Sequence, residues 1–435
     1  MKVYIETFGC QMNENDSERI IYLLENEGYE KTYDIAASDL IVINTCTVRE
    51  KAKNRLYGHI GNLKVLKNKN RDIIVCIGGC TAQDLKEKLI EDFPFVDIVF
   101  GTHNIAELPE LIKRRVSTVK SICSVENNGF DSDLYKVKRE KNFKAFVPIT
   151  IGCDNYCSYC IVPFVRGNEK SVEPGKIIKN IKELVSRGVI EVTLLGQNVN
   201  SYGKNLNELC TFSELLEKVS DIKGLKRIRF MTSHPKDFSK SLIDIIKDRD
   251  NIVKHIHLPL QAGSNKILKE MNRNYTREDY LNIIKDIKKK IPDCAITTDI
   301  IVGFPGEARG DFLKTLDMVK EVRFNRAFTF IYSSRAGTKA SKMKDYTPPD
   351  EKRKWFRELV ETQNKISYEK NKKFVGKNFE VLVEGKSKKD GLLLEGRMEN
   401  NNIVNCKGDG SLTGKVVRVM ITGAKTFYLM GELTH

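Results

Sequence analysis

The chain of 435 residues has no long apolar run, and no stretch approaches the roughly 18 consecutive apolar residues that span a bilayer. Its opening, MKVYIETFGC, also lacks the apolar segment of a secretory signal peptide. We therefore expect a soluble cytoplasmic protein with no membrane partner, whose 11 cysteines are thiols in a reducing compartment. The length exceeds that of a single core, so two or three domains are expected.

Acidic residues are under-represented: 58 Asp and Glu stand against 73 Lys and Arg, for a net charge of +15. Such an excess favours a polyanionic partner such as a nucleic acid. Ordinary solvated surfaces can produce part of the same excess, so the charge alone does not decide between the two interpretations.

The most informative motif lacks a fourth ligand. GCDNYCSYC places Cys153, Cys157 and Cys160 at C-x3-C-x2-C spacing, and no Cys or His follows closely. A structural zinc site needs four ligands, and a disulfide with a spare thiol needs an oxidising compartment. A four-iron cluster held by three thiolates leaves one iron open, which is where chemistry takes place. The spacing therefore predicts an iron–sulfur cluster with an open iron.

Three more cysteines follow predicted strands in a first domain, residues 1–117. Apolar runs alternate there with amphipathic stretches, as in an α/β domain with a parallel sheet. The predicted strands are Lys2–Thr7, Leu40–Asn44, Asp72–Ile77 and Val96–Phe100, and the predicted helices are Asn15–Glu27, Arg49–Lys67 and Asp84–Asp92.

Cys10, Cys46 and Cys80 come directly after the first three strands, in FGC, NTC and GGC. Free cysteine is often only a small buried hydrophobe, as we expect for Cys76 within the third strand. Because the carboxyl ends of parallel strands meet at one edge, three cysteines at equivalent positions predict a second cluster site.

A second domain is expected over residues 139–369, after a basic, irregular stretch (Arg114–Lys144) that contains NNGFDSD and Cys123. Six strand–helix units predict a partial (β/α)6 barrel with the Cys153 loop at its carboxyl face, where barrel enzymes place their chemistry. The predicted strands are Ala145–Ile151, Glu191–Leu195, Arg227–Met231, His255–Leu258, Ala295–Val302 and Arg326–Ile331.

Glycine and polar residues gather at the ends of these strands. They are Gly196, Gln197, Asn198, Thr232, Ser233, His234, Pro259, Leu260, Gln261, Asp299, Gly303, Gly306 and Glu307. Glycine lets a backbone approach a cofactor, and Gln or Asp can bind its polar groups, although such residues often only complete turns.

Other polar or reactive residues in this domain have a structural alternative. His234 and His257 could act as bases, but we favour satisfied or solvated histidines. Arg166, in PFVRG, could meet a phosphate or carboxylate or form a structural ion pair. Cys210 and Cys294, like Cys123 of the linker, have no partner at ligand spacing and are interpreted as incidental.

A third domain is expected at residues 370–435, after a helix at Asp350–Lys373. Short strands at Asn378–Glu384, Leu392–Arg397, Ile403–Cys406, Gly414–Ile421 and Phe427–Glu432 predict a small five-stranded antiparallel barrel. Eleven basic against seven acidic residues from Lys372 onward suit contact with phosphates, and a barrel that serves only for packing is the alternative.

These motifs resemble known families. The C-x3-C-x2-C motif with Tyr159 before its last cysteine resembles the radical S-adenosylmethionine (SAM) superfamily. TFGCQMNENDS, NTCTVREKA and GGCTAQ resemble the amino-terminal domain of methylthiotransferases, and the tail resembles the TRAM domain, an RNA-binding module.

The resemblance implies two [4Fe–4S] clusters. One, on Cys153, Cys157 and Cys160, binds SAM at its open iron and cleaves it to an adenosyl radical. The other, an auxiliary cluster on Cys10, Cys46 and Cys80, carries the inserted sulfur. The SAM contacts that it implies are Tyr159, Gln197, Ser233, Gln261, Asp299 and Gly303. The family more usually has GFPGET where this chain has GFPGEARG. Ala308 therefore stands in place of the family's threonine and lacks a hydroxyl for a cofactor contact.

GCQMN, VREKA and NYC favour the branch that converts isopentenylated adenosine at position 37 of tRNA to its 2-methylthio derivative. The alternatives are the branches that modify threonylcarbamoyl-adenosine or an aspartate of a ribosomal protein, and a non-catalytic iron–sulfur RNA-binding protein. The resemblance implies a tRNA partner with an unstacked anticodon-loop adenosine, a sulfur donor and an electron-donor protein. We expect a monomer.

Overall fold

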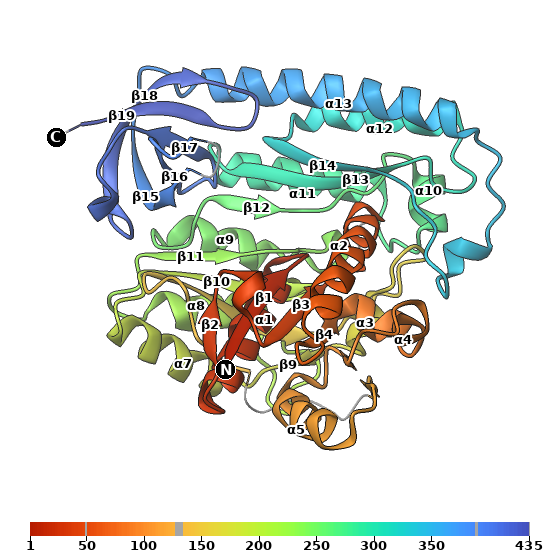
Figure 1. The fold of residues 1–435 in the computed structure, drawn as a ribbon. Coiled ribbons are helices and arrows are strands. Elements are labelled where there is room, and N and C mark those ends of the chain that lie inside the picture. Colours follow the sequence, from red (N-terminus) through yellow and green to blue (C-terminus); the bar gives the residue numbers. More distant parts are fainter. Residues whose placement is uncertain (48–49, 127–133, 388–389, 435) are drawn as a thin grey trace. The chain divides into compact units, whose positions relative to one another are not determined.

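The computed structural model describes the whole chain except residues 48–49, 127–133, 388–389 and 435, and it describes only the backbone of residues 50–55. The chain forms two compact units (Figure 1). Unit 1 comprises Met1–Glu140, Phe146–Tyr156 and Cys160–Val172. Unit 2 comprises Lys141–Ala145, Cys157–Tyr159 and Glu173–His435. The chain therefore passes from one unit to the other within the C-x3-C-x2-C motif.

Unit 1 is built on a six-stranded parallel sheet with the strand order β2-β1-β3-β4-β5-β6. Its strands are β1 Lys2–Thr7, β2 Glu30–Thr32, β3 Leu40–Thr45, β4 Ile74–Gly79, β5 Ile98–Phe100 and β6 Ile122–Ser124. Its longer helices are α1 Gln11–Asn26, α2 Glu50–Lys69, α3 Cys80–Leu85, α4 Lys88–Asp92 and α5 Leu108–Thr118.

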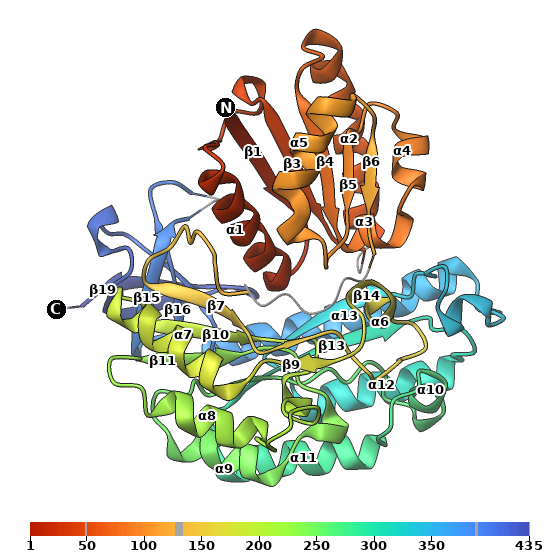
Figure 2. The same ribbon diagram turned by 90° about the horizontal axis from the view of Figure 1, so that it is seen from below.

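Helices cover both faces of this sheet (Figure 2). Side chains alternate along β3, so Leu40 and Val42 share one core with α1 and α5. Ile41 and Ile43 share the other core with α2 and α4. Every residue of β3 and β4 is buried, which explains why these strands are continuous apolar runs in the sequence.

The expected linker at Arg114–Lys144 is wrong in part, because α5 continues to Thr118 and residues 122–124 form β6. β6 adds to the sheet by pairing with β5, and it carries Cys123. A three-residue strand is too short to show a pattern of alternation, which is also why β2 was not predicted. NNGFDSD lies outside the described residues.

Unit 2 contains the six predicted strand–helix units. Its strands are β7 Lys144–Pro148, which begins in this unit, β10 Glu191–Leu195, β11 Arg227–Phe230, β12 His255–His257, β13 Ala295–Val302 and β14 Arg326–Ile331. Its helices include α7 Pro174–Ser186, α8 Phe212–Ser220, α9 Lys240–Asp248, α10 Asn265–Glu270, α11 Arg277–Lys290 and α12 Arg309–Val322. The strands form two rows, β7-β10-β11 and β12-β13-β14, and a parallel bridge between Ile228 and Ile252 links them.

The carboxyl-terminal barrel is closed, with the strand order β15-β16-β17-β19-β18. These strands are β15 Asn378–Lys386, β16 Leu394–Met398, β17 Ile403–Cys406, β18 Val416–Ala424 and β19 Leu429–Leu433. Figure 1 shows the barrel at the end of α13 (Pro349–Lys372), which runs beside α12. The predicted five-stranded barrel is confirmed, but it is not fully antiparallel, because β17 and β19 pair in parallel.

Two buried arginines of β11 hold the barrel against the rest of unit 2. Arg227 donates to the carbonyl oxygen of Arg397 at 3.0 Å, and Arg229 donates to those of Met398 and Glu399 at 2.9 and 3.0 Å. The Arg229 guanidinium also lies 3.0 Å from the Glu191 carboxylate, and both side chains are buried. These two arginines thus bind main-chain acceptors of the barrel, so their contacts do not depend on barrel side chains. In the described parts of the chain, no helix is long and apolar enough to span a bilayer.

Arg229→Ala should destabilise unit 2 by about 3 kcal/mol, because it leaves Glu191 and two carbonyl groups buried without their partner. The single tryptophan, Trp355, is buried on α13 and stacks on Phe312, so its fluorescence during denaturant unfolding reports on unit 2. The control is Arg249→Ala, which breaks exposed ion pairs with Glu217 and Asp221 and should cost less than about 1 kcal/mol. Equal losses for the two variants would contradict this role.

Candidate functional site

The three strand-ending cysteines of unit 1 gather at one edge of its sheet. Cys10 precedes α1, Cys46 follows β3 and Cys80 begins α3. Gly9 has a φ of +143°, and a Cβ there would lie only 2.8 Å from the Cβ of Cys46. A glycine before Cys10 therefore lets this loop approach Cys46 closely.

Electrostatics also indicate that the three thiols are neighbours. The pKa of the Cys80 thiol is raised to about 12, mainly by burial; Arg166 lowers this pKa, and the neighbouring Cys46 and Cys10 contribute to raising it. In the described part of the chain no three Cys, His, Asp or Glu side chains form a ready-made metal site. The donor set nevertheless suits a cluster: the three thiols are neighbours at one edge of the sheet, and a bound metal centre would favour their thiolate forms.

Arg166 lies beside these cysteines. Its side chain is buried, and its guanidinium donates to the Asp16 carboxylate at 2.8 Å and to the Asn13 amide oxygen at 3.4 Å. It is also hydrogen-bonded to Cys80. Of the two roles considered for Arg166, the structure has the structural ion pair.

The C-x3-C-x2-C loop begins and ends in unit 1, with Cys153 and Cys160. The backbone N–H of Cys153 donates to the carbonyl oxygen of Gly167 at 3.1 Å, and the Tyr156 hydroxyl donates to Asn168 at 2.8 Å. The start of the loop is therefore held by the chain segment that follows the motif.

The middle of the loop, Cys157–Tyr159, belongs to unit 2. The Ser158 N–H and hydroxyl donate to the carbonyl oxygens of Met271 and Glu270 at 3.0 and 2.7 Å. The Ser158 carbonyl in turn accepts from the N–H of Ala340 at 2.7 Å. Ser158 thus has both of its backbone polar groups and its hydroxyl satisfied by unit 2.

Arg273 is a residue at this site that the sequence did not reveal. Its guanidinium donates to the Cys157 sulfur at 3.5 Å, to the Pro259 carbonyl at 3.2 Å and to the Tyr275 hydroxyl at 3.2 Å. Arg273 and Cys157 are both buried. Tyr159, a predicted SAM contact, lies close enough to Arg273 to raise the pKa of its guanidinium. Arg273 follows Cys157 by 116 residues in an ordinary loop, so no local pattern marks it.

Three of the predicted SAM contacts occupy the carboxyl ends of β10, β11 and β12. The buried Gln197 Oε1 and Ser233 Oγ have no hydrogen-bond partner among the residues that the structure describes. Gln261 has a φ of +66°, and Thr232 of the neighbouring strand end has a φ of +67°. Orphaned buried oxygens and strained backbone are typical of ligand-binding sites, so these residues fit a bound cofactor.

The other two predicted contacts have protein partners. The Asp299 carboxylate lies 3.6 Å from His257 Nε2. A Cβ at Gly303, where φ is +73°, would lie 2.5 Å from the Lys352 side chain. The close approach that requires glycine at position 303 is therefore made by Lys352.

The two histidines also have partners. His234 Nδ1 accepts from the N–H of Lys236 at 3.3 Å, and burial lowers its pKa to about 2, so the ring is neutral at pH 7. His257 Nδ1 is hydrogen-bonded to Thr297 at 3.0 Å. These contacts fit the structural interpretation favoured for both residues.

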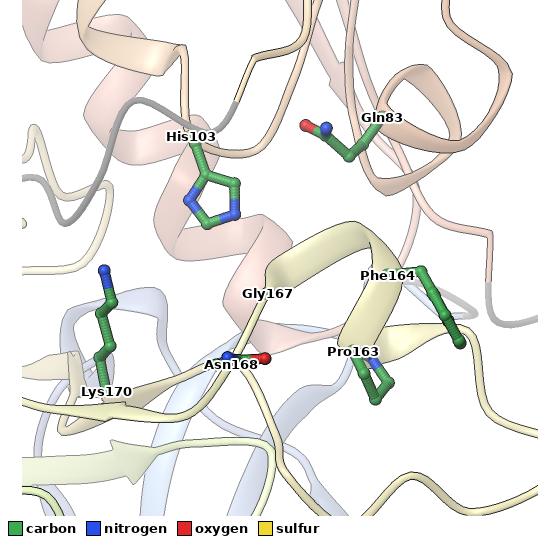
Figure 3. A pocket seen from close by; sticks show the side chains of 7 residues that line it. All are labelled: Gln83, His103, Pro163, Phe164, Gly167, Asn168 and Lys170. Atoms are coloured by element: carbon green, nitrogen blue, oxygen red, sulfur yellow. The ribbon is translucent and has the colours of Figure 1, made fainter.

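A cavity of about 330 Å³ in unit 1 lies against α6 (Val162–Arg166) (Figure 3). Its lining residues are Gln83, His103, Pro163, Phe164, Gly167, Asn168 and Lys170. The Gln83 amide is already bonded to the Val125 carbonyl and the Thr102 N–H. None of the predicted cofactor contacts lines this cavity.

Matches to models of protein families show the class of protein. A model of the radical SAM superfamily matches residues 147–319, one described as uncharacterized protein family UPF0004 matches residues 2–101, and a TRAM domain model matches residues 372–434. Radical SAM enzymes use a [4Fe–4S] cluster and SAM, and this match supports the cofactors that the sequence predicted.

Solved structures support the fold alone. The radical SAM methyltransferase TsrM from Kitasatospora setae has a TM-score of 0.56 and 14% identity, over 78% of this chain and 77% of that one. The cobalamin-dependent radical SAM enzyme OxsB has a TM-score of 0.51 and 13% identity, over 84% and 57%.

Full-length relatives define the family. A protein from Thermoanaerobacter pseudethanolicus is 50% identical over 99% of this chain and 92% of its own length. One from Clostridium perfringens is 50% identical over 99% and 97%. The chain belongs to their family, the tRNA-2-methylthio-N(6)-dimethylallyladenosine synthases.

Arg273→Ala should weaken the cluster on the C-x3-C-x2-C loop, because it removes the guanidinium that is hydrogen-bonded to the Cys157 sulfur. Anaerobic reconstitution should then yield about four irons per chain instead of about eight. The control is Arg277→Ala, which breaks a more exposed pair with Glu321 and should retain the wild-type iron content. Full iron content with an unchanged electron paramagnetic resonance (EPR) spectrum in Arg273→Ala would exclude this role.

Glu307 should make the stability of unit 2 depend on pH. Its buried carboxylate accepts from the N–H groups of Gly303 and Phe304, and burial raises its pKa from 4.5 to about 7. The folded state therefore holds this proton more tightly, and the stability that the proton contributes is complete below pH 4.5 and lost as the pH rises through 7. Between pH 5.5 and 8, wild type should lose about 2 kcal/mol relative to Glu307→Gln, as measured by Trp355 fluorescence. Parallel pH profiles would contradict this assignment.

Proposed function

We propose that the chain converts N(6)-(isopentenyl)adenosine at position 37 of tRNA to its 2-methylthio derivative. The observation that carries this proposal is the pairing of two three-cysteine sets with 50% identity, over 99% of the chain, to synthases named for this nucleoside. An aromatic C–H is neither acidic nor electrophilic enough for ordinary acid–base chemistry, so a radical route suits this substrate.

The cysteines have separate roles in this proposal. Cys153, Cys157 and Cys160 hold the cluster that binds SAM, and Cys10, Cys46 and Cys80 hold the auxiliary cluster associated with the inserted sulfur. With these groups bound, one SAM yields the radical that takes hydrogen from carbon 2 of adenine, and another supplies the methyl group.

Other residues bind, orient and shield. Arg273 donates a hydrogen bond to the Cys157 sulfur, while Ser158 fixes the middle of the loop. The unsatisfied oxygens of Gln197 and Ser233 are placed to bind polar groups of SAM. With His234 neutral and protein-bonded, no strong base is assigned, and hydrogen abstraction by a radical requires none.

The barrel and the end of α13 provide the proposed tRNA contacts. Among the residues that the structure describes, their exposed basic side chains include Lys372, Lys373, Lys377, Lys386, Lys407, Lys415, Arg418 and Lys425. Side chains exposed on a closed barrel can contact phosphates without disturbing its core. The target base must leave its stack to reach the cofactors, and the apolar isopentenyl group then adds buried surface that unmodified adenosine lacks.

The remaining partners are part of the same proposal: a sulfur donor, an electron-donor protein and a monomeric enzyme. We also propose a cytoplasmic location. Clusters held by thiolates need a reducing compartment, and the substrate requires a compartment that contains tRNA.

Mass spectrometry of tRNA nucleosides tests this function. Deletion of the gene should remove the 2-methylthio mark from isopentenyl-adenosine and leave threonylcarbamoyl-adenosine derivatives unchanged, and the wild-type gene should restore the mark.

Two cysteine variants separate the roles of the clusters. Cys157→Ala should abolish SAM cleavage, whereas Cys46→Ala should retain cleavage and stop thiolation. Loss of the mark from threonylcarbamoyl-adenosine instead would identify the other tRNA branch, and activity on ribosomes alone would identify the protein-modifying branch.

A further inference from the structure

We propose that Arg166 is a positioning residue that fixes the ligand loop of the radical cluster against the auxiliary cysteines. The inference rests on the proposed function, because it assigns both cysteine sets to clusters. All of the residues involved belong to unit 1.

The first observation is the short connection between the two cysteine sets. Cys160 is followed by Ile161 and then by α6, which ends at Arg166. Ile161 and Val165 are buried and pack in one cluster with Cys80. The Val165 carbonyl also accepts from the Thr102 hydroxyl at 2.7 Å. The segment after the last radical-cluster ligand is therefore docked on an auxiliary ligand.

The second observation is that Arg166 and its neighbour reach both cysteine sets. The Arg166 side chain is bonded to Cys80, Asp16 and Asn13. The next residue, Gly167, accepts from the N–H of Cys153 at 3.1 Å. Cys153 is thus connected to Cys80 through two adjacent residues: Gly167 accepts from the Cys153 N–H, and the Arg166 guanidinium is hydrogen-bonded to Cys80.

The third observation is chemical. Burying a guanidinium is costly unless its donors are satisfied, and Arg166 is 5% exposed. The oxygens of Asp16 and Asn13 and the Cys80 sulfur each accept from the Arg166 guanidinium. Arginine suits two acceptors at once because its donors form a planar fork, whereas lysine presents a single point charge. N–H donors and positive charge beside a cluster also raise its reduction potential.

The chain offers a matched control in Arg115, which pairs with Asp97 at 2.6 Å, and both side chains are largely buried. Asp97 precedes β5 and accepts from the N–H of Val75, near the amino end of β4. It therefore lies at the edge of the sheet opposite the cysteines. Arg115→Ala removes a buried arginine–aspartate pair from the same unit without touching either cysteine set.

The experiment compares Arg166→Ala, Arg166→Lys and Arg115→Ala as anaerobically reconstituted full-length proteins. Three quantities are measured: iron per chain, the midpoint potential of the auxiliary cluster, and 5′-deoxyadenosine formed per methylthiolated nucleoside. The potential is measured with Cys153, Cys157 and Cys160 all changed to Ala, so that only the auxiliary cluster remains.

Arg166→Ala should lower the auxiliary potential and raise 5′-deoxyadenosine per product roughly ten- to a hundred-fold, as expected when reacting groups are misplaced. Arg166→Lys keeps the charge and loses the fork, so it should retain most of the potential but remain uncoupled. Arg115→Ala should match wild type in both quantities. If Arg166→Ala does not bind its clusters, Arg166→Lys supplies the test.

Equal potentials and equal coupling in Arg166→Lys and Arg115→Ala would overturn the proposal. Failure of the proposed function has a different signature: wild type itself would then leave isopentenyl-adenosine unmodified. The iron content and auxiliary potential would still report on Arg166 in that case.

Discussion

The parallel sheet of unit 1 is the constraint on which the candidate site depends. Because β1, β3 and β4 run in the same direction, the residues that follow them emerge at one edge, although long helical segments separate them in sequence. Cys10, Cys46 and Cys80 are neighbours for this reason. Every residue of β3 and β4 is buried, so both strands lie in the interior of the unit, and their ends present Cys46 and Cys80 at this edge.

Three buried arginines hold anions or hydrogen-bond acceptors away from water in this fold. Arg229 satisfies Glu191 and barrel carbonyls, Arg273 meets Cys157, and Arg166 meets Asp16 and Cys80. In each case a planar group with several donors serves two or three acceptors at once. Such a group specifies geometry more strongly than a hydrophobic contact, because a displaced guanidinium leaves buried acceptors unsatisfied.

The C-x3-C-x2-C loop joins the two units within a few residues. Cys153 and Cys160 belong to unit 1, while Cys157 and Ser158 are anchored to unit 2. Because metal binding by thiolates is coupled to folding, a cluster on this loop would stabilise the fold of the loop itself.

The sequence by itself determined most of the elements and the choice of six candidate ligand cysteines, because ligand spacing, strand-ending positions and apolar periodicity are local properties of the chain. The sequence was also sufficient to identify the family and to predict the five strands of the carboxyl-terminal barrel. It did not determine β2 and β6, whose three residues are too few to show alternation and which exist through pairing with a neighbouring strand. The parallel pairing of β17 with β19, and the partners of Arg166 and Arg273, were decided only by the tertiary structure. Contacts between residues more than a hundred positions apart leave no periodic trace, and burial of a charged side chain becomes evident only when its partner is in place.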